Sequence, residues 1–254
     1  MVIAMLLAVQ ISAQGASLDC PVEWQVSQRN AEGWAQIKVA GSCPANTSLV
    51  ECKVELAAGL RGKATDWTVV AQGAQIKDAK FSGIIKLATG GWYTLKVRFR
   101  KSTDDPAVLG ESAIEHVGVG DIFVVAGQSN SSNHGAERQT TSTGLVAAFD
   151  GKHWQLANDP QPGASGDAGS FQPPFGDAIA TKFKVPVGII ACGIGATSVR
   201  EWLPKGATFP NPPTLEGRVR QLPSGEWESK GEAFDMLTGR MKQSGPKGFR
   251  AVLW

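Results

Sequence analysis

Alternation of apolar and polar residues at period two runs through the first part of the chain and predicts β-strands there. The clearest stretch is residues 92–100, and shorter ones cover 22–26, 35–39 and 52–56. Breaks rich in Gly, Asp and Pro separate them, as the turns between short strands require. The pattern predicts an N-terminal all-β domain, an immunoglobulin-like sandwich, over residues 18–115.

The pattern changes after residue 117, where predicted strands alternate with predicted helices. Continuous apolar runs at 122–126 and 185–192 indicate strands buried on both faces of a sheet. Helical spacing of apolar residues predicts two helices, one with Phe175, Ile179 and Phe183, the other with Phe234, Leu237 and Met241. Such alternation is typical of a parallel sheet with crossover helices, so residues 117–254 are expected to form an α/β domain. Residues 115–118 are the expected boundary.

The first strand of this second domain ends in polar residues that no hydrophobic core requires: Gly127, Gln128, Ser129 and Asn130. In open parallel sheets, chemistry takes place at the carboxyl ends of the strands. A helix beginning just beyond Ser129 would point free amide groups at its hydroxyl, which suits a nucleophile whose attack forms an oxyanion. The alternative is that Ser129 only caps a helix.

A second polar turn follows the next strand. It reads Gly193-Ile194-Gly195-Ala196-Thr197-Ser198-Val199-Arg200-Glu201-Trp202. Glycine lets a backbone amide approach a ligand closely, because no side chain stands in the way. Taken alone, the turn is equally compatible with an ordinary strand-to-helix connection.

Together the two turns resemble two sequence blocks of the SGNH hydrolase superfamily, in the branch of sialate O-acetylesterases and related carbohydrate acetylesterases. That branch has Gly-Gln-Ser-Asn in the first block and Gly-Gly-Thr, then Trp, in the second. The resemblance implies an SGNH-type α/β domain with a flavodoxin-like parallel sheet. It implies Ser129 as the nucleophile and Gly195 as an oxyanion-hole donor. Gly193 is the alternative donor, because Ala196 stands where the pattern usually has its second glycine.

The resemblance also implies an acetylated carbohydrate as substrate and no cofactor. Candidate substrate-binding residues lie in and beside the two blocks: Gln128, Asn130, His134, Thr197, Arg200 and Trp202. His134 is the histidine nearest to Ser129 in sequence. It is compatible with a loop residue that satisfies backbone groups, with a substrate contact, or with a base for Ser129.

Two further blocks of the resembling family are expected but not found. One reads Trp-His-Gln-Gly-Glu after a buried strand, and residues 248–254 resemble that strand and the first residue of the block. The other reads Asp-x-x-His and supplies the base with its carboxylate partner, which a serine nucleophile needs. We therefore expect a C-terminally truncated hydrolase domain with impaired activity. His116 falls at the expected domain boundary, and His153 in a predicted hairpin over residues 146–156.

The first residues predict export. An apolar run at 2–9 is followed by small and polar residues, which resembles a signal peptide over residues 1–16, although basic residues before the run are absent. A secreted or periplasmic protein is expected. No stretch is long enough for a membrane-spanning helix.

Composition adds little further constraint. Lys plus Arg number 25 against 23 Asp plus Glu, so no electrostatic footprint for nucleic acid is evident. Cys20, Cys43 and Cys52 allow one disulfide whose pairing the sequence leaves open, and Cys192 reads as a small buried residue. No clustered His or Cys set indicates a metal site.

The role of the β-domain is open between a structural spacer, which we favour, and a glycan-binding module. Its Trp24, Trp34, Trp67 and Trp92 could stack on sugar rings, but tryptophans of a small sandwich more often belong to the core. The sequence thus predicts an exported serine esterase that removes acetyl groups from carbohydrate. The alternative function is a non-catalytic carbohydrate-binding protein that retains the hydrolase fold.

Overall fold

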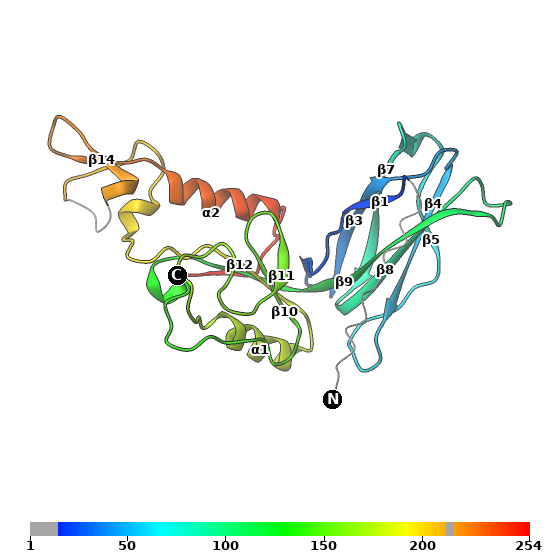
Figure 1. Cartoon of the computed structure of the whole chain (residues 1–254), viewed down its shortest axis with the longest axis horizontal. Coiled ribbons are helices and arrows are strands. Elements are labelled where there is room, and N and C mark those ends of the chain that lie inside the picture. Colours follow the sequence, from blue (N-terminus) through cyan, green and yellow to red (C-terminus); the bar gives the residue numbers. More distant parts are fainter. Residues whose placement is uncertain (1–14, 212–215) are drawn as a thin grey trace, which may run out of the picture.

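The structure is a computed structural model that describes residues 15–211 and 216–254. An N-terminal part consists of strands, and a C-terminal part consists of a sheet flanked by helices (Figure 1). The expected signal peptide, residues 1–16, lies outside the described residues except for its last two positions.

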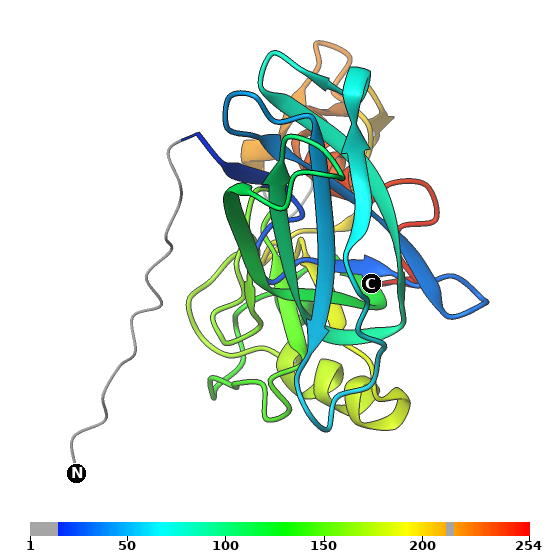
Figure 2. The ribbon, with the colours of Figure 1, turned by 90° about the vertical axis from the view of Figure 1, so that its right-hand side faces the viewer.

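Two sheets form the N-terminal part (Figures 1 and 2). Their facing side chains make one apolar core. The first, in the order β1-β3-β7-β6, contains β1 (Ser17–Cys20), β3 (Trp34–Ser42), β7 (Lys80–Ala88) and β6 (Ile76–Lys77). The second, in the order β5-β4-β8-β9, contains β5 (Thr68–Gln72), β4 (Leu49–Leu56), β8 (Gly90–Arg100) and β9 (Val108–Val125). Inward residues such as Val39, Val97 and Phe99 are fully buried, whereas their sequence neighbours are not.

The strands predicted at 35–39, 52–56 and 92–100 are confirmed as parts of β3, β4 and β8. The immunoglobulin-like classification stays a prediction. The predicted strand at 22–26 is wrong, since only Val26 belongs to a strand, β2 (Val26–Gln28), which pairs in parallel with β9. The chain turns at Trp24, which has φ 63°. The apolar residue at position 24 does not lie on a strand face. Its ring stacks on the ring of His116, with the ring centroids 3.6 Å apart.

The C-terminal part has a core of parallel strands in the order β10-β12-β9-β16. These are β10 (Val146–Phe149), β12 (Val187–Ala191), the last residues of β9, and β16 (Ala251–Leu253), with β11 (Trp154–Leu156) antiparallel to β10. The predicted hairpin and both predicted helices are confirmed. Helix α1 (Gln172–Phe183) packs on one face of the sheet and α2 (Glu232–Gln243) on the other (Figure 1).

Between β12 and α2 the chain forms a small three-stranded antiparallel sheet in the order β13-β15-β14. Its strands are β13 (Thr208–Phe209), β14 (Val219–Gln221) and β15 (Trp227–Ser229). Four 3₁₀ turns complete the elements of residues 15–211 and 216–254: η1 (Gly73–Gln75), η2 (Ser129–Ser131), η3 (Val199–Trp202) and η4 (Glu216–Arg218). No helix among the described residues is both long and apolar enough to span a membrane.

Strand β9 belongs to both parts. Its first half pairs with β8, and its second half pairs with β12 and β16. The expected boundary at 115–118 therefore falls inside a continuous strand, not in a linker. Gly120 is required where β9 passes Pro186, because a Cβ there would lie 1.8 Å from the Pro186 carbonyl oxygen.

All four cysteines are free thiols in the described part of the chain. Cys43, Cys52 and Cys192 are buried, as the apolar interpretation of Cys192 predicted, and Cys20 is partly exposed. The disulfide that the sequence allowed among Cys20, Cys43 and Cys52 is not formed, because all three are unpaired.

Candidate functional site

The two turns singled out in the sequence lie side by side at the carboxyl edge of the parallel sheet. Strands β9 and β12 run parallel in register, with Val125 opposite Ala191, so the chain leaves both at the same level. The Ile194 amide then donates to the Gly127 carbonyl at 2.9 Å, which ties the turns together. The tertiary structure therefore brings Ser129 and the glycine-rich turn to one place, as parallel strands require.

Ser129 begins the short turn η2 and is partly exposed. A 3₁₀ turn and not an α-helix begins there, so the condition of a helix N-terminus facing the Ser129 hydroxyl is not met. Both polar groups of Ser129 meet the side chain of Gln128: the Ser129 amide lies 2.8 Å, and its hydroxyl 2.5 Å, from Gln128 Oε1. The side chain of the preceding residue thus caps the turn, and Ser129 is not itself the cap residue.

Neighbouring serines fix the main chain of this turn. The hydroxyls of Ser131 and Ser132 donate to the Gln128 carbonyl at 2.7 and 3.3 Å, and the Ser131 amide donates to the same oxygen at 2.9 Å. Gly127 enters the turn with φ 119°, a conformation that side chains disfavour. The backbone that carries Ser129 is therefore held while its hydroxyl stays at the surface.

Gly195, the candidate oxyanion donor, lies against His134. A Cβ on Gly195 would come within 2.4 Å of His134 Nε2, so a larger residue there would displace the exposed His134 ring. The Gly195 amide donates to the Ser165 hydroxyl at 2.6 Å. The next residue, Ala196, has φ 60°, which accounts for the glycine usual at this position in the resembling family.

A cavity of about 410 Å³ opens beside Ser129. Three predicted site residues line it, namely Ser129, Asn130 and His134. The other lining residues were not predicted: Ser132, Gly135, Glu137, Gly169, Ser170 and Phe171. Those at 169–171 come from the loop before α1, and no sequence motif marks that loop as part of a site.

The other predicted substrate contacts have structural partners. Thr197 is buried, donates to the Ile194 carbonyl at 2.7 Å and accepts from Trp202 Nε1 at 2.9 Å. Trp202 is buried and packs edge-on against Trp254, with centroids 5.1 Å apart. The Arg200 guanidinium lies 6.0 Å from the ring centre of Phe209. None of the three lines the cavity at Ser129.

Buried amides support the cavity from beneath. Asn133 accepts from the Gln161 amide at 2.7 Å and donates to the Gln161 carbonyl at 3.0 Å. Gln172 Nε2 donates to the Ser131 carbonyl at 3.2 Å. These contacts join the serine turn to the loop before α1, and sequence reasoning did not identify them because the partners lie roughly 30 to 40 positions apart.

Of the three histidines, only His134 lines this cavity. His116 lies within β9, stacked on Trp24 and in contact with Glu23. His153 stands three residues after Asp150, an Asp-x-x-His spacing within the β10–β11 hairpin, with Nδ1 3.5 Å from Asp150 Oδ2. The His153 ring is exposed, and neither His116 nor His153 lines the cavity.

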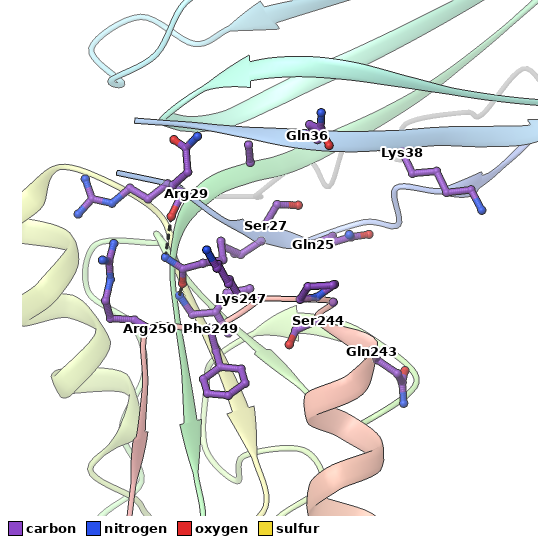
Figure 3. Close-up of a pocket in the computed structure, with 18 of the residues that line it drawn as sticks. Gln25, Ser27, Arg29, Gln36, Lys38, Gln243, Ser244, Lys247, Phe249 and Arg250 are labelled. Carbon is purple, nitrogen blue, oxygen red and sulfur yellow. Dashed lines mark hydrogen bonds between the residues drawn. The ribbon is translucent and has the colours of Figure 1, made fainter. Parts of the chain in front are cut away.

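A larger hollow of about 970 Å³ lies between the two parts of the molecule, where Ile122 of β9, strand β2 and the loop after α2 line it. Figure 3 shows Ser27 and Gln36 on its N-terminal side, and Lys247 and Phe249 on the side of the loop after α2. Ser129 does not line it. Within the described residues, no three His, Cys, Asp or Glu side chains are grouped as a metal site would require.

Comparison with known proteins identifies the family. A family model described as "Carbohydrate esterase, sialic acid-specific acetylesterase" matches residues 119–254, more than half of the chain. Among solved structures, the chain is similar to a carbohydrate acetylesterase from Xanthomonas citri, with 18% identity and a TM-score of 0.44. That similarity covers 74% of this chain and 43% of the other. No curated protein matches significantly. The resemblance seen in the sequence is confirmed, and the chain belongs to the sialic acid-specific acetylesterase family of carbohydrate esterases.

Proposed function

We propose that this chain is a serine esterase that removes O-acetyl groups from carbohydrate, with Ser129 as the nucleophile. One observation carries the proposal: the Ser129 hydroxyl borders a cavity of about 410 Å³ at the carboxyl edge of the sheet, beside the turn that contains Gly195. Family membership supports the acetylated carbohydrate as substrate.

In the proposed reaction, Ser129 Oγ attacks the acetyl carbonyl carbon and its proton passes to a base. The carbonyl π electrons move onto oxygen, where the amides of Ser129 and Gly195 stabilise the negative charge. Collapse of this intermediate breaks the bond to the sugar oxygen, which takes the proton. Water then hydrolyses the acetyl-serine, releasing acetate and restoring the hydroxyl.

We propose further that turnover by residues 1–254 alone is slow. A serine hydroxyl needs a base, most often a histidine oriented by a carboxylate. In the described ranges, His134 is the histidine at the cavity, and no carboxylate hydrogen bond or ion pair orients its ring. His134 is therefore proposed to contact substrate or to serve as an unassisted base.

The test is hydrolysis of p-nitrophenyl acetate, together with labelling by a fluorophosphonate probe. Ser129→Ala is expected to abolish both, whereas Ser224→Ala, in the exposed turn between β14 and β15, is expected to leave both unchanged. Equal rates for Ser129→Ala and the parent chain would overturn the serine assignment.

One observation favours a second candidate, a non-catalytic carbohydrate-binding protein. Both amides proposed for the oxyanion hole already donate within the protein, to Gln128 and Ser165. Glycan binding on an array of acetylated sugars, with no labelling of Ser129, would support this alternative over the esterase.

Export remains part of the proposal. The apolar run at 2–9 supports cleavage of residues 1–16 and a secreted or periplasmic location. Mass spectrometry of the secreted or periplasmic fraction is expected to find a mature chain that begins near residue 17. Recovery of uncleaved chain in the cytoplasm alone would contradict this.

A further inference from the structure

The side-chain oxygen of Gln128 occupies a specific position beside Ser129. It lies 2.8 Å from the Ser129 amide nitrogen and 2.5 Å from Ser129 Oγ. During acyl transfer, the substrate's carbonyl oxygen takes up this relation to a nucleophilic serine. It accepts from the serine amide while its carbon bonds to Oγ.

We propose that, in the free protein, the side-chain oxygen of Gln128 occupies the position that the substrate's acyl oxygen would take. The Gln128 side chain must then rotate away before an ester can react. This inference rests on the proposed role of Ser129 as nucleophile. It assigns Gln128 a positioning role that opposes substrate entry, in place of the direct substrate contact predicted from the sequence.

The second proposed donor is occupied in the same way. The Gly195 amide donates to the Ser165 hydroxyl at 2.6 Å, and the Ser165 amide donates back to the Gly193 carbonyl at 2.8 Å. Each of the two amides thus has its own internal acceptor, which an incoming carbonyl oxygen would have to displace.

The Gln128 side chain can leave without disturbing the turn. Its main-chain carbonyl accepts from the Ser131 amide and from the hydroxyls of Ser131 and Ser132, which hold the backbone. Its side chain is exposed, and within the described residues its only hydrogen bonds are those to Ser129. Rotation about its χ angles therefore opens the site while Ser129 stays in place.

The expected kinetic signature follows from where the competition acts. Gln128 competes in the free enzyme, whereas the bound complex and the transition state both have it displaced. Its removal is expected to lower KM while leaving kcat unchanged. One net hydrogen bond between neutral groups corresponds to roughly a two- to tenfold change.

The first measurement is independent of turnover. Acetate, the proposed product, is titrated into ¹⁵N-labelled protein, and the Ser129 amide resonance reports on the contact. Gln128→Ala is expected to move this resonance before acetate is added and to bind acetate about two- to tenfold more tightly. Gln128→Glu places a carboxylate, a stronger acceptor, at the same position and is expected to bind acetate more weakly.

Gln243→Ala, an exposed glutamine at the end of α2, is the matched control and is expected to behave as the parent chain. General damage to the turn would weaken acetate binding in both Gln128 variants, so opposite shifts separate competition from misfolding. An unchanged Ser129 resonance in Gln128→Ala, or no gain in acetate affinity, would overturn the inference.

The second measurement separates this inference from the proposed function. If Gln128→Ala gains acetate affinity but no variant hydrolyses p-nitrophenyl acetate, competition of the Gln128 side chain for the Ser129 amide is supported and the esterase proposal fails. If Ser129→Ala abolishes hydrolysis while Gln128→Ala alters neither KM nor acetate binding, the esterase proposal is supported and the inferred role of the Gln128 side chain is refuted.

Discussion

Arg250 forms an ion pair with Asp121 at the start of the parallel sheet. Its Nη2 and Nε donate to Asp121 Oδ1 at 2.6 and 3.1 Å. The same carboxylate binds Arg29 of the N-terminal part, whose Nη2 lies 2.8 Å from Oδ2. The Asp121 side chain is only 4% exposed. One buried carboxylate thus links the N-terminal part, strand β9 and the segment that precedes β16.

Asp121→Asn is expected to lower the free energy of unfolding by about 2 kcal/mol or more, because two guanidinium groups lose their charge partner. Urea unfolding measures the loss, with the exposed Asp104→Asn as control. Burial alone would raise the pKa of Asp121, but the bonds from Arg29 and Arg250 outweigh it and hold the pKa below its ordinary value. The stabilisation is therefore complete above about pH 4 and disappears as the pH falls through the lowered pKa. A parent chain whose stability equals that of Asp121→Asn at pH 7 would contradict the link.

Asp177 on α1 stabilises the loop before β10. Its carboxylate accepts from the Ser142 amide at 2.7 Å and from the hydroxyls of Thr141 at 2.7 Å and Thr143 at 2.5 Å. Burial raises the pKa of Asp177, but these donors overcome burial and lower the pKa to about 2 from an ordinary 3.8. Because the folded pKa is the lower one, the stabilisation is present above pH 4 and is lost between about pH 4 and pH 2.

Asp177→Asn is accordingly expected to lower the free energy of unfolding by about 2 kcal/mol at pH 7, since a charged acceptor of several hydrogen bonds is lost. The difference from the parent chain is expected to narrow as thermal unfolding is followed from pH 5 toward pH 2. The exposed Asp167→Asn is the control. A difference that stays constant over that range would rule out the titration of Asp177 as its source.

Two glycines of the second turn are expected to respond differently to alanine. A Cβ on Gly193 would lie 2.1 Å from the Ser131 carbonyl oxygen, which is backbone, whereas a Cβ on Gly195 would meet only the exposed ring of His134. Gly193→Ala is thus expected to lower the melting temperature strongly. Gly195→Ala is expected to stay folded while losing most of any esterase activity, because the His134 ring is displaced beside the proposed oxyanion donor. Comparable melting temperatures for the two variants would show that the contact at Ser131 is not rigid.

The thiols are expected to be free and slow to react. Burial raises the pKa of the Cys20, Cys43, Cys52 and Cys192 thiols, and only the thiolate form is nucleophilic. Four thiols are expected to titrate with Ellman's reagent in denaturant, and few of them rapidly in the native protein. Dithiothreitol is expected to leave the melting temperature unchanged. A fall on reduction would reveal a disulfide.

Much of the fold could be predicted from local pattern. The apolar runs that became β9 and β12 are visible because strands covered on both faces need apolar residues at every position. Helix α2 is visible because Leu237 and Met241 recur at helical spacing. The predicted strand at 22–26 is wrong because Trp24 does not lie on the apolar face of a strand. Its ring instead packs on His116, which is remote in sequence.

The site was predictable only in part, for the same reason. Ser129 and Gly195 stand at the ends of buried strands, and their spacing from those strands is written in the sequence. Ser165, Ser170 and Phe171 come from a loop without a motif, so nothing local marks them as neighbours of Ser129.

The sequence by itself determined which segments are buried, and that a serine and a glycine-rich turn follow two of the buried strands. Only the tertiary structure decided that β9 passes unbroken through both parts, and that the amides of Ser129 and Gly195 donate to Gln128 and Ser165. The physical reason is that burial of apolar side chains is imposed on each segment and leaves a periodic trace. A hydrogen bond between two loops depends on where the rest of the chain places them, and it leaves none.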